Sequence, residues 1–177
     1  MMTLGNVVAT IEHAAWLGPR LRQADVLEVE AASGVPAADA LVQAVQDSWQ
    51  AHTWMLDGQP LFIAGVVGHP DDEKLGIPWM LASDEADRHP RRYIAGGREY
   101  VKSFFERHDT LLNFVDNRNI KAQRWLHWLG FQIGDPRPFG VAGLPFRPFW
   151  LDKGASSVPR QGTINFVSHR GQPCATL

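Results

Sequence analysis

The sequence predicts a mixed α/β fold, in which helices cover both faces of one sheet, and three observations support this. Asp57-Gly58 stands between two strand-like runs and is a strong hairpin signal. Apolar side chains recur at helical spacing on both sides of that hairpin. Residues 111–131 read as a strand, a polar turn, a helix and the start of another strand. A meander of three strands followed by helix, strand, helix and strand is typical of a sheet covered on both faces.

Length and composition fit one globular domain. The chain has 177 residues, of which 45% are hydrophobic and 20% charged, with a formal net charge of −2. This charge excludes a strong basic field that would recruit nucleic acid. The one cysteine, Cys174, excludes an internal disulfide and a cysteine-based zinc site. Because no apolar run reaches membrane-spanning length and residues 1–6 do not resemble a signal peptide, we expect no membrane span and a cytosolic protein.

The first third of the chain is expected to be strand, helix, helix. Val7–His13 has the β-branched content of a strand. A helical region covers Ala15 to about Ser33, with its true start past Pro19, and a second helix covers roughly Ala37–Ala51.

A three-stranded meander and a long helix follow. The strands are expected at His52–Leu56, Gln59–Gly68 and Leu75–Ala82. Pro78 marks a bulge or an edge in the third of them, because proline has no N–H for a ladder. The helix is expected over Pro90–His108, although its Gly96-Gly97 pair costs about 1 kcal/mol per glycine relative to alanine.

The stretch from 111 to 131 has the clearest local signals. Leu111–Val115 has the length of a buried strand. Asn119 is well placed as the N-cap of the helix that follows, and Gly130 as its left-handed C-cap residue. Phe131 then begins a new extended segment.

This stretch resembles part of the Gcn5-related N-acetyltransferase (GNAT) family. In that family a helix often carries Asn-x-x-Ala and ends at Gly-Phe. At that spacing stand Asn119, Ala122, Leu129, Gly130 and Phe131. The resemblance covers roughly residues 5–135. It implies a GNAT-like, mostly antiparallel twisted sheet of six to seven strands with about four helices, in a domain spanning 5–151.

The segment that would hold the cofactor departs from the family pattern. GNAT enzymes hold the acetyl-CoA pyrophosphate with Arg/Gln-x-x-Gly-x-Gly/Ala, where glycines let backbone N–H groups approach the phosphates. The matching stretch, taken as Ser83–Arg92, has no glycine and carries Asp84, Glu85 and Asp87. Like charges oppose an anionic cofactor, although Arg88, Arg91 and Arg92 remain available as clamps. The sequence therefore predicts that no cofactor is bound.

The position of the catalytic acid departs as well. The tyrosine that protonates the departing thiolate in the family falls on Leu126, which has no proton to give. Asp84, Glu85 and His69 stay open as candidates for a general base. With both chemical requirements unmet, we expect no catalytic residues. No two histidines stand at H-x-x-x-H spacing within a helix, so we also expect no metal ligands.

The C-terminal part is rich in proline and aromatic residues. Phe146–Leu151 is expected as a seventh strand at a sheet edge. Residues 152–177 form a Gly/Ser/Pro-rich extension, which we expect to be ordered by contacts with neighbouring chains or with its own domain. The aromatic and aliphatic residues expected to bind a partner are Phe146, Phe149, Trp150, Ile164 and Phe166.

Seven tryptophans and this divergent loop resemble the GNAT-like internal virion protein A group of short-tailed phages. That resemblance implies a non-catalytic structural or assembly protein of a tailed-phage virion, assembled in the host cytoplasm with other virion proteins or as a homo-oligomer. The alternative is an active, cytoplasmic N-acetyltransferase that uses acetyl-CoA. It predicts a solvent-open cleft between the fourth and fifth strands, splayed at Pro78 and not filled by Trp79, Phe104 or Trp125.

Overall fold

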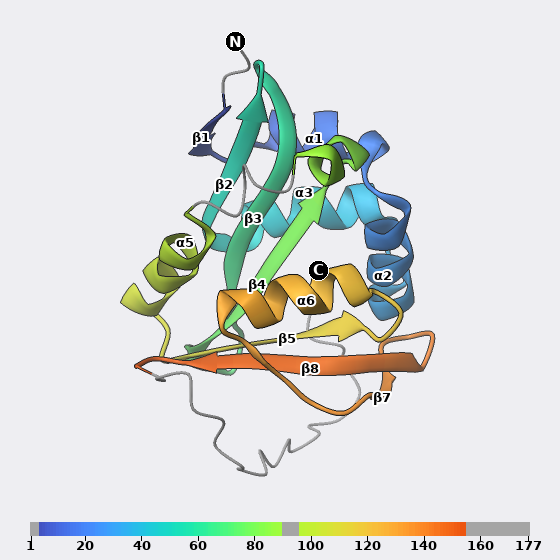
Figure 1. Cartoon of the computed structure of the whole chain (residues 1–177), viewed down its shortest axis with the longest axis vertical. Helices are drawn as coiled ribbons and strands as arrows, with labels where there is room; N and C mark the ends of the chain where they lie inside the picture. The colour runs from blue at the N-terminus through green and yellow to red at the C-terminus, as the bar shows by residue number, and fades with distance from the viewer. Residues whose placement is uncertain (1–3, 90–95, 155–177) are drawn as a thin grey trace.

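The computed structural model describes residues 4–89 and 96–154, and these ranges form one sheet with helices on both faces (Figure 1). The strands are β1 (Leu4–Val8), β2 (Ser48–Leu56), β3 (Gln59–His69), β4 (Asp72–Ala82), β5 (Thr110–Asp116), β6 (Gln132–Ile133), β7 (Arg137–Phe139) and β8 (Leu144–Asp152). Their order is β1-β2-β3-β4-β5-β8-β6, and β7 also pairs with β8. Every pairing is antiparallel except β4 with β5. The predicted mixed, mostly antiparallel sheet is confirmed.

Five α-helices lie in the described ranges: α1 (Ile11–Leu17), α2 (Gln23–Ser33), α3 (Ala37–Asp47), α5 (Gly97–Ser103) and α6 (Ile120–Leu129). Short 3-10 turns lie at η1 (Gly18–Arg20), η2 (Asp84–Arg88) and η3 (Phe104–Glu106). None of these helices is long and apolar enough to cross a membrane.

Alternating side chains along β3 divide the core into two layers. Ile63 packs in one apolar cluster with Leu17 of α1 and Leu41 of α3. Its neighbours in the chain, Phe62 and Ala64, belong to a different cluster that Tyr100 of α5 covers. Successive residues of a strand point to opposite faces, so α1 and α3 cover one face and α5 covers the other. Figure 1 shows α6 crossing β4 in front of the sheet while α3 lies behind it.

The first predicted strand was wrong at its C-terminal end. β1 stops at Val8, and α1 begins at Ile11. Thr10 is the N-cap: its side chain accepts a hydrogen bond from the His13 backbone N–H, and the His13 ring accepts one from the Thr10 N–H. This reciprocal cap turns the chain into a helix despite the β-branched residues around it.

The next two helices also needed correction. The region predicted as one helix over 15–33 is interrupted by η1 at Gly18–Arg20, so that α2 starts at Gln23, which fits the predicted start past Pro19. The helix predicted over 37–51 ends at Asp47, and β2 already begins at Ser48. The spacing of apolar residues did not distinguish the end of α3 from the first residues of β2, which follow it directly.

The helix predicted over 90–108 is described only from Gly96 onward. There α5 begins at Gly97, with Gly96 as its N-cap in a left-handed conformation (φ 87°), and the α-helix ends at Ser103. Residues 90–95 lie outside the described ranges. The glycine pair therefore stands at the start of α5 and not in its interior, where the sequence analysis placed it.

The capped helix at 120–129 was predicted correctly. The Asn119 side chain accepts a hydrogen bond from the Ala122 backbone N–H at 3.2 Å, and Gly130 has φ 103°. The strand predicted over Phe146–Leu151 exists as β8, but it is not an edge strand, because it lies between β5 on one side and β6 and β7 on the other.

Proline is tolerated inside β8 for a specific reason. The Pro148 carbonyl accepts a hydrogen bond from Gly134, on the side away from β5. The nitrogen and carbonyl of a strand residue point to the same side, so the missing N–H of Pro148 removes no bond from the β5–β8 ladder. Residues 155–177 of the predicted C-terminal extension lie outside the described ranges.

Candidate functional site

A cleft opens where the two parallel strands part. β4 and β5 are paired only at Leu75 with Thr110 and at Gly76 with Leu111. Beyond these pairs lies a cavity of about 150 Å³, lined by residues of α2, β3, β4, β5, α5 and α6. The four consecutive residues Pro78–Leu81 all border it. Because alternate strand residues face opposite sides of the sheet, the cavity must border the edge of β4 and not one face alone.

The parting strands leave backbone groups of β4 without ladder partners, and side chains satisfy some of them. The Asn113 side chain of β5 donates to the Pro78 carbonyl at 2.9 Å. Of the bulge or edge predicted at Pro78, the bulge is absent, because the β3–β4 register runs through Pro78 without a shift. The edge is present, because β4 pairs with β5 only at Leu75 and Gly76. Pro78 therefore occupies a place where the β5 side of the strand has no ladder, so its missing N–H costs no hydrogen bond.

The backbone of Met80 faces the same opening. Residues 78, 80 and 82 direct their N and O atoms to the same side of β4, because the pleat repeats every two residues. The Pro78 carbonyl is bound by Asn113. The Ala82 N–H is bound by Asp25 of α2, and the Ala82 carbonyl by Arg22, the N-cap residue of α2. Within the described ranges no hydrogen bond engages Met80 on this side. One donor and one acceptor therefore remain exposed to the cleft in the middle of β4.

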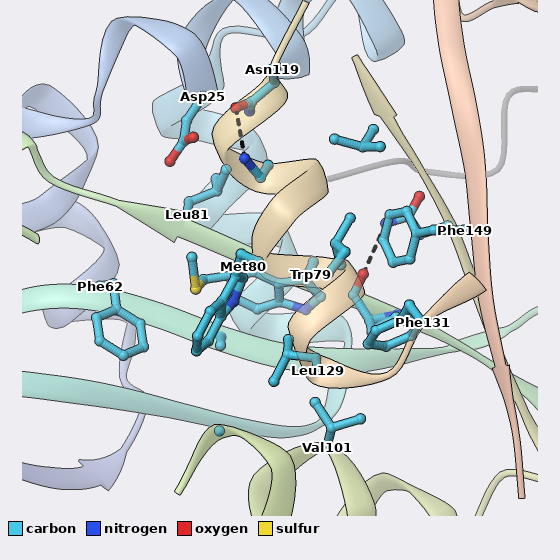
Figure 2. Close-up of a pocket in the computed structure, with 18 of the residues that line it drawn as sticks. Asp25, Phe62, Trp79, Met80, Leu81, Val101, Asn119, Leu129, Phe131 and Phe149 are labelled. Carbon is cyan, nitrogen blue, oxygen red and sulfur yellow. Dashed lines mark hydrogen bonds between the residues drawn. The ribbon is translucent and has the colours of Figure 1, made fainter. Parts of the chain in front are cut away.

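The walls of the cleft are largely apolar and aromatic. Figure 2 shows Phe62, Trp79 and Met80 along the strands, and Phe131 and Phe149 toward the C-terminal end of α6. Three aromatic side chains were considered as possible fillings of the cleft: Trp79, Phe104 and Trp125. All three line the cavity, and none of them closes it. The cleft predicted under the enzyme alternative is therefore present.

Proton donors are scarce in this lining. Leu126, which occupies the position of the family's tyrosine, borders the cavity. Tyr100 of α5 is the hydroxyl-bearing residue among the described lining residues, and it donates to the Ala64 carbonyl at 2.9 Å. Burial raises the pKa of Tyr100 above its usual range, so its hydroxyl stays protonated but is a weak acid.

Helix α2 fastens the C-terminal end of β4. The Arg22 backbone N–H donates to the Ala82 carbonyl, and the Ala82 N–H donates to Asp25 Oδ2 at 2.8 Å. Arg22 also holds Asp25 through its Nη2 at 2.8 Å, and its Nη1 reaches Asp87 at 3.0 Å. Burial raises the pKa of the Asp25 carboxyl, whereas the guanidinium and the amide oppose that rise. Figure 2 places Asp25 near Asn119 at one end of the cleft.

One turn further along α2, Glu28 makes the corresponding link to β5 and α6. Its Oε2 accepts hydrogen bonds from the Asp116 backbone N–H at 3.2 Å and from Asn119 Nδ2 at 3.0 Å. Burial raises the pKa of the Glu28 carboxyl to about 7; these two hydrogen bonds oppose the rise, and the Asp25 and Asp116 carboxylates add to it. Asp25 and Glu28, three residues apart, lie on the same side of α2 and reach the two diverging strands.

This pKa makes stability depend on pH. Between pH 4.5, the ordinary pKa, and about pH 7, the unfolded chain loses the Glu28 proton while the folded chain keeps it, so Glu28 lowers stability as pH rises. Replacing Glu28 with glutamine removes this titration and keeps an oxygen acceptor. In urea unfolding, we expect the stability of Glu28→Gln relative to the parent to increase by about 1–3 kcal/mol between acidic and mildly alkaline pH.

Glu30→Gln is the matched control, because Glu30 lies exposed on the same helix. Its stability should follow that of the parent across the pH range. If the curves of Glu28→Gln and the parent also ran parallel, Glu28 would titrate alike in the folded and unfolded chains.

The sequence patterns above did not single out Asp25 or Glu28. A signal for Asp25 was present, since it lies four residues before Val29 and seven before Ala32, both of which are buried. An acidic residue in line with the buried side of a helix is rarely buried without a partner. No local pattern pointed to Glu28, because its partners lie 88 and 91 residues away.

The residues considered for a general base lie elsewhere. Asp84, Glu85 and His69 do not line the cleft. Glu85 pairs with Arg88 at 2.7 Å and with His89 at 3.0 Å.

The acidic segment after β4 is also less repulsive than the sequence implied. Asp87 binds Arg22 at 3.0 Å and Lys121 of α6 at 2.8 Å, so its charge is compensated. The connection from β4 to α5 runs to Gly96, beyond the glycine-free stretch that was compared with the family pattern. Both observations weaken the sequence-based objection to an anionic cofactor.

The residues expected to bind a partner have different surroundings. Phe146 is fully buried, and Phe149 is nearly so and lines the cleft, so neither offers surface to a partner in the folded domain. Trp150 is half-buried on β8, and its role in partner binding stays a prediction. Ile164 and Phe166 lie outside the described ranges.

No group of three or more histidine, cysteine, aspartate or glutamate side chains in residues 4–89 and 96–154 could hold a metal ion.

Comparison with known proteins identifies the fold. No protein-family model matches the sequence, and no curated protein matches it. Solved structures do match.

A protein of Acinetobacter baylyi ADP1 assigned to the acetyltransferases has a TM-score of 0.67 at 13% identity, over 92% of this chain and 98% of its own. A GNAT-family acetyltransferase of Streptococcus pneumoniae has a TM-score of 0.60 at 13% identity, over 86% of this chain and 100% of its own. AAC(6')-Ib, in complex with ribostamycin and coenzyme A, has a TM-score of 0.61 at 17% identity, over 85% of this chain and 94% of its own. The chain therefore has the fold of the GNAT acetyltransferases.

Proposed function

We propose that the chain is an acyl-CoA-dependent N-acyltransferase, and that acyl-CoA binds in the cleft between β4 and β5. The observation that carries this proposal is the parting of the two parallel strands after Gly76 and Leu111, with an open cavity between them. Ligands of open α/β sheets bind where parallel strands separate at their C-terminal ends. Similarity to acetyltransferase structures, one of them in complex with coenzyme A, supports acyl-CoA as the ligand.

The exposed backbone of Met80 supports this function chemically. An extended ligand arm that carries amides can pair with an open strand edge in the way an added strand does. A backbone N–H fixed at that edge can also polarise a thioester carbonyl and stabilise the negative charge that develops during attack. The apolar walls lower the local dielectric constant at that position and strengthen the interaction.

The proposed reaction proceeds without a strong acid at the position of Leu126. The amine attacks the thioester carbonyl, the C–S bond breaks, and the thiolate leaves with the electron pair. A thiolate is a stable leaving group near neutral pH, because the pKa of a thiol is about 8.5. The missing tyrosine therefore slows the reaction less than it would if an alkoxide had to leave.

Calorimetric titration with acetyl-CoA tests the proposal. We expect the parent chain to bind with a dissociation constant on the order of micromolar. Ala122 lines the cleft, so Ala122→Phe should fill it and weaken binding by about tenfold or more, a change of about 1.4 kcal/mol. Ala24→Phe, at an exposed position of α2, is the matched control and should bind as the parent does. A parent chain that binds no acetyl-CoA at millimolar concentration would contradict the proposal.

The second candidate is the non-catalytic virion or assembly protein predicted from the sequence. Leu126 at the place of a proton donor favours it, since a scaffold without catalysis has no need of one. It predicts no acetyl-CoA binding and recovery of the chain with other virion proteins. The titration above therefore distinguishes the two candidates.

A further inference from the structure

We propose that Glu28 accepts a proton from the amine that is acylated in the cleft, which makes Glu28 a catalytic residue carried by α2. This inference rests on the proposed function and adds the group that activates the acceptor.

The position of Glu28 suits this task. Its carboxylate lines the cleft, and its Oε2 is fixed by Asn119 and by the Asp116 N–H. Among the described residues, none donates a hydrogen bond to Oε1. The side chain keeps accessible surface because it borders the cavity, although protein surrounds it. One carboxylate oxygen is therefore anchored and the other is free to bind a ligand.

The neighbouring charges leave Glu28 as the available carboxylate. Asp25 and Glu28 are the two acidic side chains among the described lining residues, and Asp25 is held by Arg22. Asp116, which faces Glu28 from β5, is held by Arg118 at 2.6 Å. No salt bridge joins Glu28 to another described residue. The Arg118 guanidinium attracts it electrostatically but is itself bound to Asp116, so the Glu28 carboxylate can attract and neutralise an ammonium group.

The protonation equilibrium of Glu28 fits a base that works near neutral pH. With a pKa of about 7, both the carboxylate and the carboxylic acid are populated at neutrality. General acid–base catalysis is most effective when the pKa of the group lies near the working pH. Burial above all, and then the Asp25 and Asp116 carboxylates, favour the protonated form of Glu28, whereas Asn119 and the Asp116 amide favour the ionised one.

The proton transfers then balance as follows. The acceptor enters as an ammonium ion, and the Glu28 carboxylate takes one proton. The free nitrogen lone pair forms the C–N bond to the thioester carbonyl, and the C–S bond breaks with its electron pair on sulfur. The second N–H proton goes to sulfur and gives the thiol, and Glu28 returns its proton to solvent. An alkylammonium group, with a pKa of about 10.4, gives up a proton to this carboxylate far more readily than an alcohol does, so the proposed acceptor class is an amine.

A purely structural role for Glu28 must be separated from this one. Glu28 links α2 to β5 and α6, so removing it could reduce activity by moving α2. Glu28→Gln keeps an oxygen that accepts the bonds from Asn119 and Asp116, and it removes the proton acceptor. Two nucleophiles then distinguish the roles, because n-butylamine is cationic at neutral pH, with a lysine-like pKa of about 10.4, whereas hydroxylamine is already neutral.

The experiment follows thiol release from acetyl-CoA with each nucleophile across the neutral pH range. For n-butylamine, we expect Glu28→Gln to lower kcat/KM by about 10²–10⁴-fold and to remove the rise in rate near pH 7. For hydroxylamine, we expect a loss of about tenfold or less. In calorimetry, Glu28→Gln should bind acetyl-CoA with the same affinity as the parent. Glu30→Gln, the matched control, should match the parent in every assay.

Three results would overturn parts of this picture. Equal losses with both nucleophiles, or an unchanged pH profile, would make Glu28 a structural link. Acetyl-CoA binding by the parent without transfer to either nucleophile would overturn the role of Glu28 and leave the cleft as an acyl-CoA site. A parent chain that binds no acetyl-CoA would overturn the proposed function itself.

Discussion

Replacing Asp25 with alanine is expected to lower the free energy of unfolding by about 3–5 kcal/mol, as measured by urea denaturation. Asp25 is 4% exposed, accepts the Ala82 N–H at 2.8 Å and pairs with Arg22. Its removal leaves a largely buried guanidinium with Asp87 as its remaining carboxylate partner and deprives a buried amide of its acceptor. Losing one member of such a group costs much more than the net contribution of the pair.

Two further variants divide this loss between its causes. Asp25→Asn keeps an oxygen for the Ala82 amide but removes the charge, so we expect a stability between those of the parent and Asp25→Ala. Asp39→Ala removes an exposed carboxylate from the first turn of α3 and should change stability by about 0.5 kcal/mol or less. If Asp25→Ala cost no more than Asp39→Ala, α2 would not fasten the end of β4 as the hydrogen bonds indicate.

The parts of the fold that the sequence predicted well are those fixed by neighbouring residues. The ends of α6 were predicted from Asn119 and Gly130, because each of these capping residues acts within one helical turn. Asp57-Gly58 closes the β2–β3 hairpin through two left-handed residues, with φ 49° and 78°. Such signals depend on local backbone geometry, so they can be recognised without knowing the tertiary structure.

The predictions that failed depended on distant contacts or on competing local ones. β8 was expected at an edge because of its prolines, but Pro148 directs its nitrogen away from β5, which only the register reveals. At Thr10, a reciprocal cap with His13 outweighed a run of strand-forming residues.

The cleft shows the same division between local and distant information. Pro78 and Leu126 were recognised from the sequence as special positions, and both border the cavity. Asp25 and Glu28 were not, because the bonds that place them at the ends of β4 and β5 span 57 and 88 residues. The sequence therefore indicated that the cleft lacks a proton donor at Leu126, but it did not indicate the carboxylates that α2 brings to the cleft.

The turn between β7 and β8 holds the other end of α2. The Val141 N–H donates to the Ala32 carbonyl and the Ala142 N–H to the Ala31 carbonyl, both at 3.1 Å. These bonds satisfy carbonyls of the last turn of the helix, which have no partner within it. The approach requires glycine at 140, because a Cβ there would lie 2.5 Å from the Ala32 Cα.

Replacing Gly140 with alanine is therefore expected to destabilise the fold by about 2–4 kcal/mol in urea denaturation, from left-handed backbone strain and the loss of these hydrogen bonds. Gly143→Ala is the matched control. It shares the left-handed conformation, with φ 60° against 69° at Gly140, but its Cβ would meet no atom within 4 Å. It should cost about 1–2 kcal/mol, from backbone strain alone.

Helix α2 also carries Asp25 and Glu28 at one end of the cleft. If Gly140→Ala displaces the turn, α2 and these two carboxylates should shift with it, whereas Gly143→Ala should leave them in place. We therefore expect weaker acetyl-CoA binding in calorimetry for Gly140→Ala only. Equal stability losses in the two variants would show that the close approach to Ala32 relaxes freely, and that this turn does not position α2.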